Sequence, residues 1–532
     1  MTQSFFADSS STPLAYSKSL LAASIHIALA GAFALALPSN ASAQEERVSR
    51  AEFEALVKRL EDLETENHRL RGVEVEALQN ERISPSDVNH AERIAPGLVG
   101  FNSDYSFKIL DHAENTNTKQ IVQLRALQEG ALASDVTLGG QVTALANYQR
   151  ANENSKFGWL MRHPTSSNQI GENVSEAVVH SANLNVTGRL GSDFTAYIDL
   201  LYNPEQSFGA GASITGLTRN ILSARRAYVM WGNLDNTPVY ASIGKMDIPF
   251  GLNDTVSPFT NSTSWHSFGG LAYGGLVGYA KEGLHIRAMA IQGGAQFRNA
   301  NTPVEGTNVP SKLNNFALDA NYEITTAAGS NLMLGGSYQY GTGYCQNYVD
   351  TPERAHSTFP ALLPDVTRNT SSQGVTHFAS CPDNNDAVAV YARLQHDRLQ
   401  LIAEIGKTLN DWPGTASPYI PEFEATGNTT FTLGGRFDAN FGLPKPVSLS
   451  AEFSRYEAGA SGSPWEKQDQ SVIGASYFFS SNVNLFAEVI HVDGWVPFNF
   501  LSGGNPGGLV AESWSSQTSN TDVITFGLQT AF

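Results

Sequence analysis

The sequence predicts an all-β fold, a transmembrane antiparallel β-barrel of about sixteen strands over residues 136–532, preceded by a short periplasmic coiled-coil helix. Two observations carry this prediction. Segments with alternating apolar and polar side chains recur along this part of the chain, and the connections between them alternate between short turns and long loops. Outer-membrane barrels have this asymmetry, with short periplasmic turns and long outer loops.

The expected strands lie near 136–150, 177–190, 194–203, 222–233, 239–248, 273–281, 284–293, 313–324, 331–341, 386–397, 399–407, 429–441, 447–457, 470–480, 483–492 and 520–532. An even count places both termini at the same side, which we expect to be the periplasm. A soluble β-sandwich produces the same alternation, but charges on the polar face of strand after strand favour a water-filled barrel.

The last strand ends the chain on Phe532, with Ile524, Phe526 and Leu528 on the same face. We expect this face to contact lipid. The strand must also pair with the first one near residue 136, because an unpaired strand edge in lipid leaves backbone groups without hydrogen bonds.

The N-terminal residues 1–43 are typical of a secretory signal peptide. Lys18 precedes a largely apolar stretch from Leu20 to Leu37, and the small-residue site Ala41-Ser42-Ala43 follows. The alternative is a retained single-span anchor. Export is the interpretation used for the rest of the chain.

Residues 44–71 contain "FEALVKRLEDLETENHRL", whose apolar residues recur at spacings of three and four with Asn67 in the seam. This pattern predicts a periplasmic coiled-coil helix that associates with copies of itself, and a homotrimer is the assembly considered. The alternative is an amphipathic helix lying on its own domain. Residues 72–135 are expected to be a periplasmic linker or plug-like extension, with helical character near Ile121 to Leu127.

Composition and motifs exclude several classes of function. The chain is 41% hydrophobic, which excludes a disordered chain, and its net charge of -18 argues against a nucleic-acid partner. No metalloprotease, nucleophile-elbow or phosphate-loop motif is present, and the histidines lack metal-ligand spacing. We therefore expect no enzyme activity, no metal and no cofactor, and the expected partners are outer-membrane lipid and a small solute.

Cys345 and Cys381 are the two cysteines of the chain, and both lie in one long outer loop of the predicted barrel. Because an exported protein meets an oxidising compartment, we expect them to form one loop-closing disulfide.

Sixteen strands enclose an aqueous channel, so inward-facing charges are candidate ligand groups. In "LSARRAYVMWG", neighbouring strand residues face opposite ways, so one of Arg225 and Arg226 is expected in the lumen, where it would bind carboxylate or phosphate. Arg287, Arg393 and Arg436 are further candidates among inward charges of both signs. The alternative is that such arginines pair with acidic residues and brace the wall.

The most distinctive stretch is "IGKMDIPFGLNDTVSPFTNSTSWHSFGGLAYG". Pro249 ends a strand, and residues 249–272 form a loop whose Trp265 and His266 are candidate ligand groups. Such a loop either folds into the pore as a constriction or covers the rim.

This stretch, together with "SFKILDHAENTNTKQIVQL", "TLGGQVTALANYQR", a heptad segment and a terminal Phe, resembles the LbtU-type siderophore porin family of outer-membrane proteins. The resemblance implies passage or binding of an iron-loaded siderophore, typically a polycarboxylate, at the cell surface. "IGKMDIPFG" is also similar to a strand-loop junction of phosphate-selective, OprP/OprO-like porins, although this chain lacks their dense ladder of basic residues.

The expected function is therefore that of an outer-membrane porin that passes or binds a ferric siderophore in iron uptake. A general or anion-selective small-solute porin and a barrel enzyme are the alternatives. A TonB-dependent receptor would need about twenty-two strands and a larger plug. In a trimeric adhesin each chain would supply only a few strands.

Overall fold

The computed structural model describes residues 58, 97–161, 170–202, 222–292, 312–326, 329–342, 344, 384–412, 415, 422–457, 459–463, 465–494 and 518–532. Within these residues no helix combines the length and the apolar character that crossing a membrane requires. The predicted signal peptide 1–43, the Cys345–Cys381 pair and, apart from Lys58, the predicted coiled coil 44–71 lie outside the described residues.

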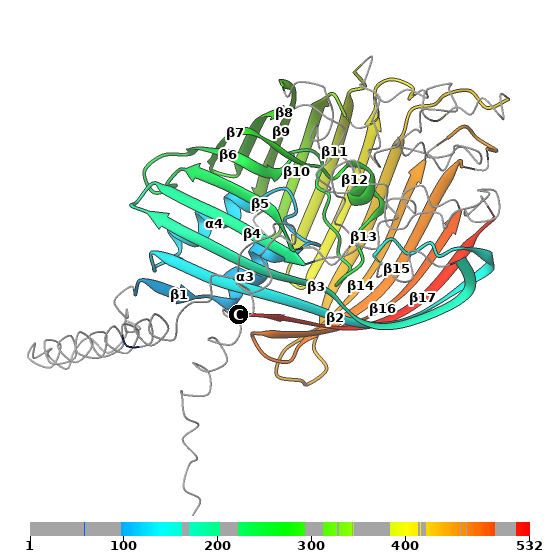
Figure 1. Cartoon of the computed structure of the whole chain (residues 1–532), viewed down its shortest axis with the longest axis horizontal. Helices are drawn as coiled ribbons and strands as arrows, with labels where there is room; N and C mark the ends of the chain where they lie inside the picture. The colour runs from blue at the N-terminus through cyan, green and yellow to red at the C-terminus, as the bar shows by residue number, and fades with distance from the viewer. Residues whose placement is uncertain are drawn as a thin grey trace, which may run out of the picture. The chain divides into compact units, whose positions relative to one another are not determined.

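Sixteen antiparallel strands form the barrel, as predicted. They are β2 Val136–Lys156, β3 Ile170–Leu190, β4 Phe194–Tyr202, β5 Leu222–Trp231, β6 Val239–Asp247, β7 Leu271–Lys281, β8 Leu284–Gln292, β9 Leu313–Thr325, β10 Asn331–Tyr340, β11 Ala387–His396, β12 Leu399–Thr408, β13 Thr429–Ala439, β14 Val447–Glu457, β15 Lys467–Phe478, β16 Val483–Gly494 and β17 Asn520–Ala531. Most ends agree with the sequence prediction to within a few residues, but β2 and β3 extend further into the first loop (Figure 1).

Each strand pairs with its neighbours in sequence, and β17 closes the barrel on β2. The amide N–H of Phe532 donates to the Gly140 carbonyl and the Gly140 N–H donates to the Phe532 carbonyl, both at 3.0 Å. A short strand, β1 (Val99–Phe101), pairs in parallel with Val136–Leu138, the part of β2 that lies beyond the end of β17. The same edge of β2 therefore pairs with β1, which precedes it in the chain, and with β17, the last strand.

The two faces of the wall differ as the alternation predicts. On β17, Ile524, Phe526 and Leu528 are exposed on the outside, whereas Val523 and Thr525 are buried inside. Large apolar side chains are exposed in the same way on the other strands of the barrel. An apolar outer band around a polar interior is the arrangement of a barrel that spans a membrane.

The connections define two ends of the barrel. Turns 191–193, 282–283 and 397–398 share one end, here called the short-turn end, with Phe532. The long connections, including 248–270 and 341–386, share the other, here called the loop end.

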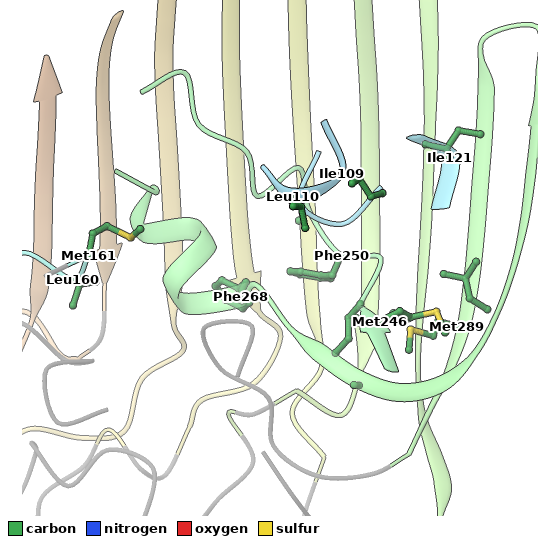
Figure 2. Close-up of a cluster of buried hydrophobic side chains, with 14 of the residues drawn as sticks. Ile109, Leu110, Ile121, Leu160, Met161, Met246, Phe250, Phe268 and Met289 are labelled. Carbon is green, nitrogen blue, oxygen red and sulfur yellow. The ribbon is translucent and has the colours of Figure 1, made fainter. Parts of the chain in front are cut away.

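Two segments enter the barrel and pack together inside it. One is the plug, residues 97–135, which contains β1, α3 (Ser103–Leu110) and α4 (Lys119–Gln128). The other is the constriction loop, residues 248–270, which contains α6 (Thr263–Phe268). Ile109, Leu110 and Ile121 of the plug belong to one buried cluster with Phe250 and Phe268 of the constriction loop, and Figure 2 shows these side chains inside the curved wall.

The plug has its own local order. Asn102 caps α3 by accepting a hydrogen bond from the Tyr105 N–H at 2.9 Å. Lys119, in the first turn of α4, donates from its buried Nζ to the carbonyl of Asp111 at 2.5 Å and to those of Lys108 and Glu114. A lysine ammonium thus satisfies carbonyls at and beyond the C-terminus of α3, which fixes the two helices relative to each other.

Phe526 gives a test of the membrane-facing surface, because it lies near the middle of β17 and is 62% exposed. Phe526→Arg should destabilise the folded barrel in phospholipid vesicles by about 2–4 kcal/mol, since it moves a charge into the hydrocarbon region. Thr530→Arg, on the same face but close to the chain end, should cost only about 0–1 kcal/mol. Urea-induced unfolding followed by tryptophan fluorescence measures both, and equal costs would contradict the assigned membrane face.

Candidate functional site

Three glutamates on alternate strands of the wall hold the constriction loop inside the barrel. Glu404 on β12, Glu452 on β14 and Glu488 on β16 are all buried. They accept from the N–H groups of Leu252 (2.7 Å), Asn253 (2.9 Å), Val256 (2.9 Å), Phe259 (2.8 Å) and Thr260 (3.0 Å), and from the hydroxyls of Thr255 (2.6 Å) and Thr260 (2.5 Å). The loop therefore crosses the lumen and does not cover the rim.

Glycines on the strands between these glutamates make room for the loop. An ideal Cβ on Gly434 of β13 would lie 2.6 Å from Val256, and one on Gly474 of β15 would lie 2.5 Å from Pro258. Neither contact is tolerable for a real side chain. The wall thus alternates between strands that supply a carboxylate and strands that leave space for side chains of the loop.

Trp265 and His266 lie on α6 within the constriction loop, and both are fully buried. Their rings contact each other at 4.8 Å in an edge-to-face arrangement. The Ser264 hydroxyl lies 2.7 Å and 2.6 Å from the hydroxyls of Thr430 and Thr432 on β13. These contacts make the two predicted ligand residues part of the packed interior, so a solute reaches them only if α6 moves.

The plug meets the constriction loop through backbone and amide hydrogen bonds. Asn117 Nδ2 donates to the carbonyls of Phe250 at 3.1 Å and Gly251 at 2.5 Å. The Thr255 N–H donates to the Ala113 carbonyl at 3.0 Å. The two segments enter the barrel from opposite ends and join near its middle, so together they narrow the lumen.

Most of the candidate lumen arginines are paired with carboxylates. Arg226 donates to Asp247 at 2.5 Å and 2.8 Å and to Asp199 at 3.1 Å, and all three side chains are buried. Arg287 donates to Asp319 at 2.6 Å. These contacts neutralise the guanidiniums in place, as the wall-bracing alternative anticipates.

The other two arginines link the wall to the inner segments. Arg393 on β11 forms an ion pair with Asp254 of the constriction loop, and Arg436 on β13 forms one with Glu114 of the plug. Both guanidiniums are about a quarter exposed, so a solute contacts them more easily than it contacts Arg226 or Arg287.

Arg225 and Arg226 depart from simple alternation. Asp199 pairs with Arg226 and Leu200 pairs with Ala224, so Arg225 is the extra residue of a β-bulge on β5. Both arginines are buried, whereas strict alternation predicts only one in the lumen. A bulge re-aims one side chain, which explains the difference.

A cavity of about 230 Å³ lies between the plug, the constriction loop and strands β8–β11. Asn117, Arg125, Asp254, Glu323 and Arg393 are among its lining residues, and it reaches the β7–β8 turn at the short-turn end. The charges in its wall have both signs. A small polar solute therefore meets groups for either charge in this part of the lumen.

Burial shifts the pKa values of two side chains of the plug, His112 and Asp111. It lowers the pKa of His112 to about 3, with a further contribution from His180, and His112 Nε2 donates to the Phe259 carbonyl at 3.0 Å. Burial and the neighbouring Glu114 raise the pKa of Asp111 to about 6. Because the docked plug disfavours a proton on His112, that residue weakens docking as pH falls from 6.5 towards 3, whereas Asp111 strengthens docking as pH falls from 6 to 3.8.

Sequence reasoning found the inward positions of Arg287, Arg393 and Arg436 but missed the residues of the plug. Asn117 and Lys119 sit in a polar segment without a recognised motif. Their roles depend on partners more than a hundred residues away or on the turn between two short helices. The nearest signal in the sequence is the helical character that becomes α4.

Removal of one loop-holding carboxylate tests this arrangement. Glu452→Ala leaves the Val256 N–H and the Thr255 hydroxyl without their acceptor, so the folded state should lose about 1–3 kcal/mol. Glu457→Ala, on the same strand but exposed, should change stability by less than about 0.5 kcal/mol. Chemical unfolding in detergent micelles compares them, and an unchanged Glu452 variant would rule out the assigned anchoring.

Protonation of His112 provides an independent test of the plug position. In the folded protein with isotope-labelled histidine, the imidazole resonance absent from a His112→Gln variant should titrate at about pH 3. An exposed histidine titrates near 6.5. A His112 midpoint at that value in the folded barrel would show that the plug is not buried in solution.

No family model and no curated protein matches this chain. Among solved structures, it is similar to an anion-selective porin from Comamonas acidovorans, with 12% identity over 75% of this chain and 99% of that one and a TM-score of 0.43. The outer membrane channel DcaP of Acinetobacter baumannii shows 15% identity over 74% and 96%, with a TM-score of 0.41. OmpT of Vibrio cholerae shows 10% identity over 75% and 97%, with a TM-score of 0.39. All three TM-scores lie below 0.5, so the fold rests on the strand pairing described above.

Proposed function

We propose that this chain is an outer-membrane porin that admits small polar solutes. The observation that carries this proposal is a closed barrel of sixteen strands with an apolar outer band, whose interior is polar and is narrowed by a loop folded in from the loop end. A barrel of this size encloses more space than wall side chains fill. Both termini of the barrel unit are assigned to the periplasm, where short turns lie in such proteins.

The paired charges of the lumen favour passage of both cations and anions and do not favour selectivity for anions. Arg226, Arg287, Arg393 and Arg436 each have a carboxylate partner, so these four arginines do not form a row of uncompensated positive charge along the described wall. The anion selectivity in the name of the Comamonas acidovorans porin is therefore not extended to this chain. The paired arginines support the general porin rather than the phosphate-selective alternative.

Passage or binding of a ferric siderophore is the more specific proposal. It rests on the motif resemblance and on partly exposed Arg393 and Arg436, whose guanidiniums suit a polycarboxylate chelate. The cavity of about 230 Å³ is smaller than the sites that hold drug-sized ligands, so a chelate of that size needs the inner segments to move. A homotrimer and a Cys345–Cys381 disulfide remain proposals.

Channel activity tests the general function. Purified protein reconstituted into planar lipid bilayers should produce stepwise conductance, with cation and anion permeabilities that differ by less than about tenfold because the lumen charges are paired. A matched control is the same detergent preparation without protein. A folded barrel that never conducts would contradict the porin proposal.

Uptake by cells tests the more specific function. Cells that produce the protein should accumulate radioactive iron complexed with citrate, a polycarboxylate chelate, faster than cells that lack it. Uptake of a neutral sugar serves as the reference for general porin activity. Faster sugar uptake with unchanged iron uptake would leave a general porin and remove this ferric polycarboxylate from the proposed substrates.

A further inference from the structure

The plug occupies the short-turn end of the lumen and reaches opposite walls. Tyr105 of α3 places its hydroxyl 2.9 Å from that of Thr187 on β3, and Gln123 of α4 accepts from the Tyr228 hydroxyl of β5 at 3.0 Å. On the far side, eight strands round the wall from β5, Glu114 of the plug forms an ion pair with Arg436 of β13. A segment of only 39 residues (97 to 135) thus bridges the lumen.

The side of the plug that faces the constriction loop makes many hydrogen bonds. Asn117 donates to two loop carbonyls, and its own carbonyl and Oδ1 accept from Arg287 at 2.5 Å and 3.2 Å. The Thr116 N–H donates to Asp254 Oδ1 at 3.1 Å, and Glu114 pairs with Arg436. These contacts form a latch, defined here as residues 113–117 of the plug.

The side that faces β3 and β4 is polar but poorly bonded. Several buried polar atoms there have no hydrogen-bond partner among the described residues: Ser106 Oγ on the plug, and Asn185 Oδ1 and Nδ2, Thr195 Oγ1 and Tyr197 OH on the wall. A Cβ on Gly139 would lie 2.0 Å from Ser106 Oγ and 2.8 Å from Asn185 Nδ2, so plug and wall groups face each other here.

The unpartnered polar atoms oppose docking of the plug along β3 and β4. Each buried polar group without a partner loses its bonds to water and gains none in return, which opposes docking by an amount comparable to one hydrogen bond of the latch. Moving the plug away from β3 and β4 would expose these groups to water. The unpartnered polar groups along β3 and β4 therefore favour release of the plug, and the contacts of the latch oppose it.

The plug is also tethered at both ends of its path. Its C-terminal end runs directly into β2, and its N-terminal end pairs through β1 with residues 136–138. Gly130 has a φ of 75°, a left-handed conformation that side chains disfavour, and it follows α4. A released plug stays attached to the barrel beside its own docking site.

We propose that the plug is a gate, closed by the latch, whose displacement opens the short-turn end of the lumen to solutes. This inference rests on the proposed porin function. The polar seam against β3 and β4 is the surface along which the plug separates and which solutes then pass. The constriction loop stays in place during this motion, because three glutamates of the wall hold it to β12, β14 and β16.

Substitution of the latch tests the gate. Asn117→Ala removes the side-chain bonds to the loop and to Arg287, so the ratio of open to closed time in bilayer recordings should rise by about tenfold to thirtyfold. Lys108→Ala, on the exposed side of α3, is the matched control and should leave that ratio unchanged. Equal ratios for both variants and the original protein would overturn the proposal.

A reversible crosslink separates gating from misfolding, because the same molecule is measured twice. Ala113→Cys with Thr255→Cys, in a Cys345→Ser and Cys381→Ser background, joins two residues linked by a backbone hydrogen bond. The oxidised protein should stay at its lowest conductance level and the reduced protein should regain openings, while Thr255→Cys alone should not respond to oxidation. Equal openings of the oxidised and reduced double variant would overturn the gate but not the porin, whereas no conductance in any form, Asn117→Ala included, would overturn both.

Discussion

The closure of β17 on β2 is the constraint on which the rest of the structure depends. Once Phe532 and Gly140 exchange their hydrogen bonds, every barrel strand has two neighbours and the circumference of the barrel is fixed. Sixteen strands set a lumen too wide for wall side chains to fill. Two segments of the chain occupy the remaining space. The plug enters from the short-turn end and the constriction loop from the loop end. Backbone in the interior requires hydrogen-bond partners, and inward-facing polar residues of the wall supply many of them.

The interior charges follow from this requirement. Glu404, Glu452 and Glu488 accept hydrogen bonds from backbone amides of the constriction loop. The buried arginines Arg226 and Arg287 form ion pairs with carboxylates. A buried charge that lost its partner would destabilise the barrel strongly. Much of the ionic character of the lumen is therefore structural, and the charges left for solutes are those at the junctions between the wall and the inner segments. The net charge of the chain, -18, says little about what the lumen selects.

The strands could be predicted because alternation reports directly which face of the wall a residue occupies. The positions of Ile524, Phe526 and Leu528 on the outer face are confirmed, as is the pairing of the last strand with the first. Alternation does not report what fills the interior. It placed only one of Arg225 and Arg226 inside because a bulge cannot be read from polarity, and it left the constriction loop undecided between pore and rim. The sequence left residues 72–135 undecided between a periplasmic linker and a plug-like extension, and the structure places 97–135 inside the barrel. The contacts of the plug could not be predicted, since they join segments distant in sequence and two short helices carry little pattern.

The shared edge of β2 has a consequence for how the barrel is assembled. Residues 136–138 pair with β1 and residues 140–151 pair with the C-terminal strand, so the start and the finish of the barrel unit occupy successive lengths of one template. The plug is continuous with that template, so the last strand pairs alongside the segment that leads the plug into the lumen. The strand pairing that closes the wall thus also fixes where the plug enters, at the short-turn end of the lumen.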